Sequence, residues 1–315
     1  MPILSNAVKA LLVAALLMSG MVSAVAEPLK LRIGVQKYGT LVILAERHTL
    51  EQKLAPQGIE VEWKEFPAGP QLLEALTVGS IDFGTTGEAP PIFAQAAGSP
   101  LVYAGVEPAA PTGEAILVPK DSAIRSVSEL KGKRVALNKG SNVHYLLVRA
   151  LAAAGLTPKD IQPVYLTPAD ARAAFESGGV EAWAIWDPFL AAAQDATGAR
   201  SLTDGTGLVA NRQFYLASKS FAAAHPELIG TLLEAIGATD AWAEEHQGEV
   251  AALLSPRTGI AAPVLAISLK RLGYGVKPLD EDAIAGQQRI ADTFLGLGLI
   301  PRPVTVRDIV WAPKS

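Results

Sequence analysis

One pattern of residues occurs twice in the chain, about 100 residues apart. The first copy, "FPAGPQLLEALTVGSIDFGTTGEAP", begins at Phe66, and the second, "LTPADARAAFESGGVEAWAIWDP", begins at Leu166. Each copy runs from the end of a strand through a proline, a helix, a glycine and an acidic residue to another strand and a polar turn. Two copies indicate two α/β lobes of similar build, because a solenoid needs three or more.

Short apolar runs alternate with helical patterns along most of the chain, which indicates an α/β protein. We expect strands at Leu29–Val35, Ile59–Phe66, Ile81–Thr85, Leu101–Val106, Ala115–Pro119, Lys133–Asn138, Ile161–Leu166 and Glu181–Trp186. Helices are predicted between the strands, among them Leu72–Val78, Val143–Gly155 and Asp170–Ser177. After Phe221 the pattern is almost wholly helical, and we expect these helices to pack on the first lobe.

The two lobes are expected to form a hinged cleft between two mixed sheets flanked by helices. We assign residues 1–26 to a leader, residues 27–119 and 215–315 to the first lobe, and residues 120–214 to the second. Ligands of open α/β sheets bind beyond the carboxyl ends of the strands. The residues that follow each predicted strand are therefore the candidates for a binding site.

The first 26 residues are typical of a secretory signal peptide. Lys9 is their only charged residue, Ala10–Met18 is an apolar run, and the small residues Ala24 and Ala26 precede Glu27. An uncleaved anchor is the alternative, but it needs about 18 apolar residues in a row. We expect a cleaved signal and no lipid anchor, because no Cys stands at the cleavage site.

Charge and composition exclude several classes of function. Without the leader, 26 basic and 31 acidic residues give a net charge of −5 with no basic stretch, so nucleic-acid binding is not expected. The absence of Cys excludes thiolate nucleophiles, zinc–thiolate sites and iron–sulfur clusters. All Met residues lie in the leader, so the mature chain contains no sulfur. Either Leu and Val replace Met in an Ala-rich core, or the protein is made in bulk when sulfur is scarce.

Two polar turns are predicted to open helices at the ends of strands. We expect Thr86 or Gly87 to cap a helix that holds Pro90 and Pro91 in its first turn. Likewise, "KGSNVH" should place a cap at its Ser or Asn, before a helix that starts at Val143. Each turn directs backbone N–H groups and the positive end of a helix dipole into the cleft. The pair predicts a neutral cage for an anion, although a single turn of this kind usually has only a structural role.

The composition of these turns favours a sulfonate over a phosphate. A sulfonate stays ionised near neutral pH, so N–H and O–H donors suffice to hold it. A phosphate monoester keeps a proton near pH ~6 and often binds an Arg side chain. The turns contain no Arg, and the nearby Lys37 and Lys139 are of a kind that is usually solvated.

Four further residues are candidates for the cleft, each with an alternative role. Trp183 and Trp186 point to opposite faces of a strand, so one belongs to the core while Trp186 covers the organic part of a ligand or is itself core. Asp187 caps the following helix, binds a ligand hydroxyl or amine, or bridges the lobes. Tyr215 lies in the core or in the cleft, and Glu114 is a hinge hydrogen-bonding residue or a solvated charge.

Enzyme motifs are missing or isolated. The tripeptide Asp82-Phe83-Gly84 matches one that kinases use to hold magnesium, but no Gly-rich strand or catalytic loop accompanies it. There is no GxGxxG, GxxxxGK[ST] or GxSxG motif. Metal-binding spacing is absent among the histidines, which are His48, His144, His225 and His246. We expect no metal, no cofactor and no catalysis.

Several stretches of the chain match a known family, namely "GVQK", "EFPAGPQLLEALTVGSIDFGTTGEAPPIFAQAAG", "LVYAGVEP", "LKGKRVALNKGSNVH" and "TPADARAAFESGGVEAWAIWDPF". They closely resemble the periplasmic aliphatic sulfonate-binding proteins of bacterial ABC importers. The parts "GPQLLEAL" and "GSIDFG" are shared with relatives for taurine, nitrate or thiamine precursors and indicate the fold. The parts "PADARAAF…AWAIWDP" and "PPIFAQAAG" point to sulfonates. The resemblance covers nearly the whole chain after the leader and is strongest from Leu31 to Tyr215.

The resemblance implies a type II periplasmic-binding-protein fold without catalysis. It implies a monomeric periplasmic receptor that delivers organosulfonates to a membrane permease and its ATPase, and it favours sulfur scarcity as the reason for the sulfur-free chain. The sequence departs from the family at Glu88, where the family has Asp, and at Asn142-Val143, where it has serines. The family's ligand pocket maps onto Gln36, Thr85, Thr86, Gly87, Glu88, Ser141, Asn142, His144, Trp186 and Asp187.

Two other functions stay open. A receptor of the same type could take taurine, nitrate or a sulfate ester, because tail selectivity depends on small differences in pocket depth. Enzymes on the same fold, such as sulfinate desulfinases and pyrimidine synthases, use a Cys nucleophile or a Cys-rich iron site. This chain has neither.

Overall fold

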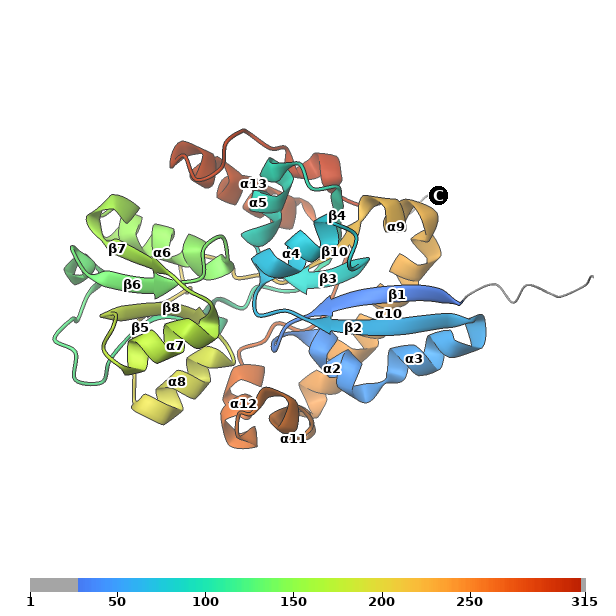
Figure 1. Ribbon diagram of the computed structural model, residues 1–315, viewed down its shortest axis with the longest axis horizontal. Coiled ribbons are helices and arrows are strands. Elements are labelled where there is room, and N and C mark those ends of the chain that lie inside the picture. The colour runs from blue at the N-terminus through green and yellow to red at the C-terminus, as the bar shows by residue number, and fades with distance from the viewer. Residues whose placement is uncertain (1–27, 313–315) are drawn as a thin grey trace, which may run out of the picture.

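Two five-stranded sheets form the centres of two lobes in the computed structural model, which describes residues 28–312 (Figure 1). The predicted signal peptide, residues 1–26, lies outside the described residues. Each sheet combines parallel and antiparallel pairs and is flanked by helices. The predicted two-lobed α/β architecture is therefore confirmed.

The first sheet has the strand order β2-β1-β3-β10-β4. β1 pairs in parallel with β2 and β3, while β10 runs antiparallel to β3 and β4. The central strands β3 and β10 are buried along their whole length, because helices cover both of their faces. The strands are β1 (Leu29–Val35), β2 (Ile59–Glu65), β3 (Phe83–Thr86), β4 (Leu101–Val106) and β10 (Phe214–Ser218).

The second sheet repeats this arrangement with the order β7-β6-β8-β5-β9. β6 is parallel to β7 and β8, and β5 is antiparallel to β8 and β9. In each sheet the fourth strand is the one that has just crossed from the other lobe. The strands are β5 (Glu114–Val118), β6 (Arg134–Leu137), β7 (Gln162–Tyr165), β8 (Ala182–Trp186) and β9 (Arg200–Asp204).

The repeated sequence pattern folds into equivalent units, α4–β3–α5 in the first lobe and α7–β8–α8 in the second. Proline stands in the first turn of α4, α5 and α7, where its missing N–H is harmless. Left-handed Gly98 and Gly198 end α5 and α8. The helices of the two units are α4 (Gly69–Thr77), α5 (Pro90–Ala97), α7 (Pro168–Glu176) and α8 (Phe189–Thr197).

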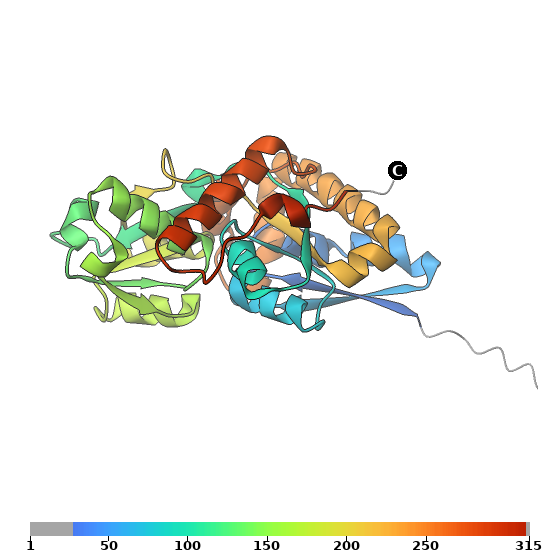
Figure 2. The ribbon, with the colours of Figure 1, turned by 90° about the horizontal axis from the view of Figure 1, so that it is seen from above.

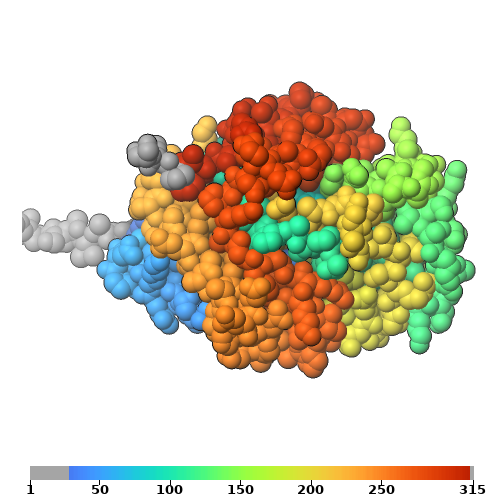
Figure 3. All heavy atoms as spheres, turned by 180° about the vertical axis from the view of Figure 1, so that it is seen from behind, coloured from blue at the N-terminus to red at the C-terminus, as the bar shows by residue number. Residues whose placement is uncertain are grey.

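Two segments cross between the lobes, one before β5 and one before β10. Figure 3 shows the molecule from behind, on the side opposite to the view of Figure 1. The sequence pattern placed residues 114–118 in the first lobe, but β5 pairs with β8 and β9 and so belongs to the second sheet. Periodicity marks a strand without saying which sheet it joins, which explains the error. Strands β9 and β10 were not predicted either. The other lobe boundaries remain a proposal.

The C-terminal helices pack mainly on the first lobe. α10 covers a face of the first sheet, α11 and α12 pack with α2, and α13 packs with α5 (Figure 2). α12 also contacts α8 of the second lobe. The remaining helices are α2 (Thr40–Arg47), α3 (Thr49–Leu54), α6 (Asn142–Ala153), α9 (Lys219–Ala224), α10 (Pro226–Glu245), α11 (Gln247–Thr258), α12 (Ala262–Leu269) and α13 (Glu281–Gly296).

Within residues 28–312, no single helix combines the length and apolar character needed to cross a membrane. Helices α11 and α12 meet that criterion only as a pair, across a bend of 118°.

Candidate functional site

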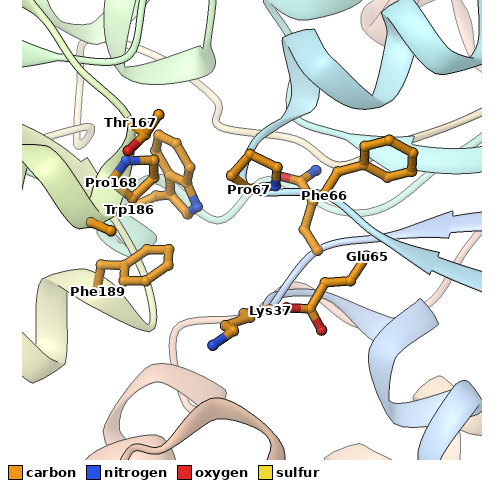
Figure 4. A pocket seen from close by; sticks show the side chains of 10 residues that line it. Lys37, Glu65, Phe66, Pro67, Thr167, Pro168, Trp186 and Phe189 are labelled. Atoms are coloured by element: carbon orange, nitrogen blue, oxygen red, sulfur yellow. The ribbon is translucent and has the colours of Figure 1, made fainter.

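A cavity of about 320 Å³ opens between the two lobes (Figure 4). Trp186 and Phe189 of the second lobe face Phe66 and Pro67 of the first, so the walls are largely apolar. The other lining residues are Gln36, Lys37, Glu65, Thr167, Pro168 and Ala169. Most of them follow the carboxyl ends of β1, β2, β7 and β8, where α/β proteins bind ligands. A small organic molecule fits this volume, since ligand pockets begin at about 300 Å³.

Gln36 connects the cavity to the first predicted turn. Its Nε2 donates to the carbonyl oxygen of Thr85 at 2.9 Å. Thr85 and Thr86 are buried, and their hydroxyls donate to the carbonyls of Phe214 and Gly87. Both hydroxyl protons are therefore already used to hold the turn. These two side chains do not offer the O–H donors that the sequence suggested.

The two predicted turns meet across the boundary between the lobes. Gly87 follows β3 in the first lobe, and Asn142 is the first residue of α6 in the second. A Cβ atom at Gly87 would lie 2.9 Å from both Cβ and Cγ of Asn142. Glycine permits this approach because it has no side chain to collide. The fold thus brings together the segments predicted on the two sides of the cleft.

Four backbone N–H groups at this contact find no acceptor within residues 28–312. They belong to Gly87, Glu88, Asn142 and Val143. Ser141 is the N-cap residue of α6, as predicted, but its hydroxyl donates to the Asn138 carbonyl at 2.7 Å and makes no capping hydrogen bond. Ala89, and not Thr86 or Gly87, is the N-cap residue of α5. Because neither helix has a side-chain cap, both N-termini remain able to bind an anion.

Asp187 lies directly after Trp186 and is completely buried. Its Oδ1 accepts a hydrogen bond from the Ala191 N–H at 3.0 Å, in the first turn of α8. Its Oδ2 lies 3.3 Å from Nη1 of Arg271, which follows α12 and so belongs to the first lobe. Burial raises the pKa of Asp187 to about 6, and Arg271 limits the rise. Asp187 therefore both caps a helix and bridges the lobes.

Glu114 begins β5 and is also completely buried. Its Oε2 accepts a hydrogen bond from Nδ2 of Asn142, which also donates to Oδ1 of Asn211 at 3.0 Å. Its Oε1 has no hydrogen-bond partner. Burial and the Glu88 carboxyl raise the pKa of Glu114 well above its usual range. Glu114 is thus not a solvated charge but holds Asn142 at the contact between the turns.

The described residues, 28–312, contain no group of three or more His, Asp or Glu side chains placed to hold a metal.

The family described as NMT1/THI5 like matches residues 54–250. The periplasmic aliphatic sulphonate binding protein SsuA from Escherichia coli is 48% identical, with 90% of this chain and 98% of that chain covered and a TM-score of 0.81. The chain belongs to the aliphatic sulfonate-binding protein family. The family predicted from the sequence is thereby confirmed.

A second member of the sulfonate-binding family is the alkanesulfonate-binding protein SsuA from Xanthomonas axonopodis pv. citri, solved bound to MOPS. It is 44% identical, with 91% of this chain and 99% of that chain covered and a TM-score of 0.86. The desulfurization enzyme DSZB is 19% identical over 91% of this chain and 97% of that chain, with a TM-score of 0.65. At that identity the likeness shows the fold alone.

Glu88 of this sulfonate-binding family member does not line the cavity of Figure 4. Its Oε2 accepts a hydrogen bond from the Arg212 N–H at 3.3 Å, and its side chain lines a separate cavity with Tyr145 and Gln287. Burial raises its pKa to about 7. The expectation of a side-chain contact with the ligand is corrected here, because the turn directs the carboxyl toward α6 and α13. Only the Glu88 N–H remains available.

His144 packs in an aromatic cluster between the lobes and not in the cavity. Its ring centroid lies 6.2 Å from that of Phe93 and 5.8 Å from that of Phe294. Its Nδ1 accepts a hydrogen bond from the Gly140 N–H at 3.2 Å. Burial, with a smaller contribution from Lys139, lowers its pKa to about 4. His144 is therefore a neutral residue that holds the turn in place through the Gly140 N–H. This corrects the prediction that His144 contacts the ligand.

Tyr215 lies in the core of the first lobe. β10 pairs with β3 and β4 at its two edges, and helices cover both faces of the sheet there. The ring is stacked on Phe83 at 6.1 Å, and its hydroxyl donates to Glu107. The ring has no exposed surface for a ligand, which corrects its assignment to the site.

Several lining residues escaped the sequence reasoning. Phe66 and Thr167 stand at the ends of β2 and β7. The same strand-end rule, applied to all predicted strands, would have found them. Phe189 is the first residue of α8, two positions beyond the candidate Asp187. Arg271 had no local signal, because its partner is 84 residues away.

Proposed function

We propose that this protein is a periplasmic receptor that captures organic sulfonates and presents them to the permease and ATPase of an ABC importer. The observation that carries the proposal is the meeting of two segments that lead into uncapped helices, at Gly87 and Asn142. Gln36 links the first of them, through Thr85, to the wall of an apolar cavity. A sulfonate has three acceptor oxygens and stays ionised. Backbone N–H groups therefore hold it without an Arg side chain.

The ligand's two ends would contact different parts of the cleft. The sulfonate group binds the N–H groups of Gly87, Glu88, Asn142 and Val143, which lack other acceptors. The organic tail lies between Trp186, Phe189 and Phe66, where apolar surface leaves water on binding. Rotation of the lobes about the crossover segments would open and close this site.

The relatives and the composition support this role. The Xanthomonas relative is bound to MOPS, which is itself a sulfonate, and the Escherichia coli relative is periplasmic. As a signal peptide, residues 1–26 would direct export of this chain and then be removed. The mature chain would then be free of Met and Cys, which suits a protein made when sulfur is scarce.

Two alternatives have less support. A receptor for taurine, nitrate or a sulfate ester would use the same N–H groups. Nitrate has no organic tail for the aromatic walls, whereas taurine is itself a sulfonate with a short tail and differs from the proposed ligands only in its tail. An enzyme such as a desulfinase would need a nucleophile beside the anion site. The sequence has no Cys, and His144 is neutral and packed away from the cavity.

Calorimetric titration of the purified protein tests the proposal. We expect alkanesulfonates to bind, and pentanesulfonate to bind roughly 200-fold tighter than methanesulfonate, because each of its four additional CH₂ groups contributes about 0.8 kcal/mol when buried. Sulfate and nitrate should bind more weakly than any tailed sulfonate. Absence of binding heat with every sulfonate would contradict the proposal, as would a preference for nitrate.

Phe189→Ala should weaken binding of pentanesulfonate about tenfold and leave methanesulfonate unaffected. The ring lines the cavity, and truncating an aromatic anchor of a binding site costs more than about 1 kcal/mol. Tyr165→Ala is the matched control, because Tyr165 is an exposed aromatic of the same lobe outside the cavity. If both variants bind pentanesulfonate like the wild type, the tail does not contact this wall.

A further inference from the structure

We propose that Glu114 makes the cleft selective for sulfonates that carry an ammonium group at the end of a short tail. The inference rests on the proposed function, since it concerns the tail of the same ligand. It is carried by the position of a buried carboxyl group with a free acceptor oxygen beside the anion site.

Glu114 stands between the cavity wall and the contact of the two turns. It is paired with Trp186 across strands β5 and β8, so both side chains lie on the same face of the second sheet. Its Oε2 accepts a hydrogen bond from Asn142, which in turn touches Gly87. A ligand held at Gly87 and Asn142, with its tail directed toward Trp186, therefore passes Glu114.

No cation of the protein neutralises this carboxyl group. Within residues 28–312, neither Glu114 nor Glu88 forms an ion pair, and the Oε1 atoms of both lack a hydrogen-bond partner. Arg271 is held by the buried Asp187, and the Arg212 side chain is paired with Asp282. Two buried carboxyl groups near the contact of the turns are therefore left without a cation.

A ligand with only a sulfonate brings no hydrogen-bond donor to the free oxygen of this carboxyl group. A buried acceptor without a donor costs free energy. An ammonium on the tail removes this penalty, because it donates a charged hydrogen bond to Oε1 and balances the charge of the ionised carboxylate. Burial and Glu88 raise the pKa of Glu114, so the ammonium favours ionisation of the carboxyl on binding and a proton is released.

Two ligands that differ only in this group provide the test. Aminopropanesulfonate and butanesulfonate are alike in length, with an ammonium in one where the other has a methyl group. We expect calorimetry in sulfonate-free buffer to show binding of the aminosulfonate about tenfold tighter, the scale of a charged hydrogen bond. Glu114→Gln should abolish this preference. Glu181→Gln, in a surface pair with Arg134 of the same lobe and outside the cavity, should keep it.

A second measurement needs no variant and stays decisive if Glu114→Gln does not fold. Near neutral pH, aminopropanesulfonate should release a proton on binding, seen as a difference in binding enthalpy between phosphate and Tris buffers. Butanesulfonate should release none. The titratable groups that act with Glu114 here are Glu88 and Tyr38, and Glu88→Gln should leave the proton release in place.

The outcomes separate the two proposals. Equal or tighter binding of butanesulfonate by the wild type, or aminosulfonate binding without proton release, would overturn the role of Glu114 and leave the sulfonate receptor standing. If neither ligand binds, both proposals fall.

Discussion

Gly87→Ala should weaken sulfonate binding roughly 10- to 100-fold while the protein stays folded. The added methyl group would lie 2.9 Å from Cβ and Cγ of Asn142, closer than side chains tolerate. Overpacking of this kind costs about 1–3 kcal/mol. The two residues belong to different lobes, so the collision occurs only when the lobes close and the open form is unaffected.

Gly87→Pro should have a larger effect and abolish measurable binding. It introduces the same collision and also removes one of the four N–H groups that lack an acceptor. Comparing the two variants therefore separates the steric contribution from that of the hydrogen bond. Titration calorimetry gives the affinities, and thermal unfolding shows whether each variant is folded.

Gly248→Ala is the matched control for the first substitution. Gly248 lies in α11, and a Cβ atom added there meets nothing within 4 Å. This change should leave the affinity as in the wild type and stabilise the helix by up to about 1 kcal/mol. Wild-type affinity in Gly87→Ala would show that the contact between the turns is absent from the ligand-bound form.

The buried Glu88 carboxyl should make the protein less stable as the pH rises from about 4.5 to about 7. Burial raises the folded-state pKa of Glu88 to about 7 from its ordinary value of 4.5. Between these values the folded protein holds a proton that the unfolded chain has released. The stabilisation is complete below the lower value and is lost by the upper one, a change of about 3 kcal/mol.

Glu88→Gln isolates this contribution, because glutamine has a similar shape and does not ionise. Urea unfolding of both proteins across this range should show the wild type losing about 3 kcal/mol relative to the variant. Glu245→Gln, at an exposed position in the last turn of α10, should run parallel to the wild type. If the free energy of unfolding of Glu88→Gln also changes with pH in parallel with that of the wild type, Glu88 is hydrated in the folded protein.

Much of the fold could be predicted because its signals are local. The predicted β1 and β4 have the observed bounds, and prolines and glycines mark the helix ends of both copies of the repeat. The two strands that were missed had weaker patterns. β9 has no fully buried residue, and β10 is buried on both faces, so its sequence shows no alternation of exposed and buried residues. Which sheet β5 joins depends on contacts with residues far away in the sequence, and hydrophobic periodicity gives no information about such contacts.

The site could be predicted only in part, for the same reason. The turns at Gly87 and Asn142 were identified from strand ends and helix starts, which are sequence-local features. The directions of the side chains were not. Glu88 contacts Arg212, which lies 124 residues further along the chain, and Asp187 contacts Arg271.

The sequence by itself determined the two α/β lobes, the paired turns with backbone donors, the family and the absence of thiol chemistry. Strand periods, turn residues and composition encode these properties within short windows. Only the tertiary structure decided that Asn142 fills the space against Gly87, that Glu114 is left with a free oxygen beside it, and that Tyr215 is core. These depend on how distant segments pack, which no short window of sequence contains.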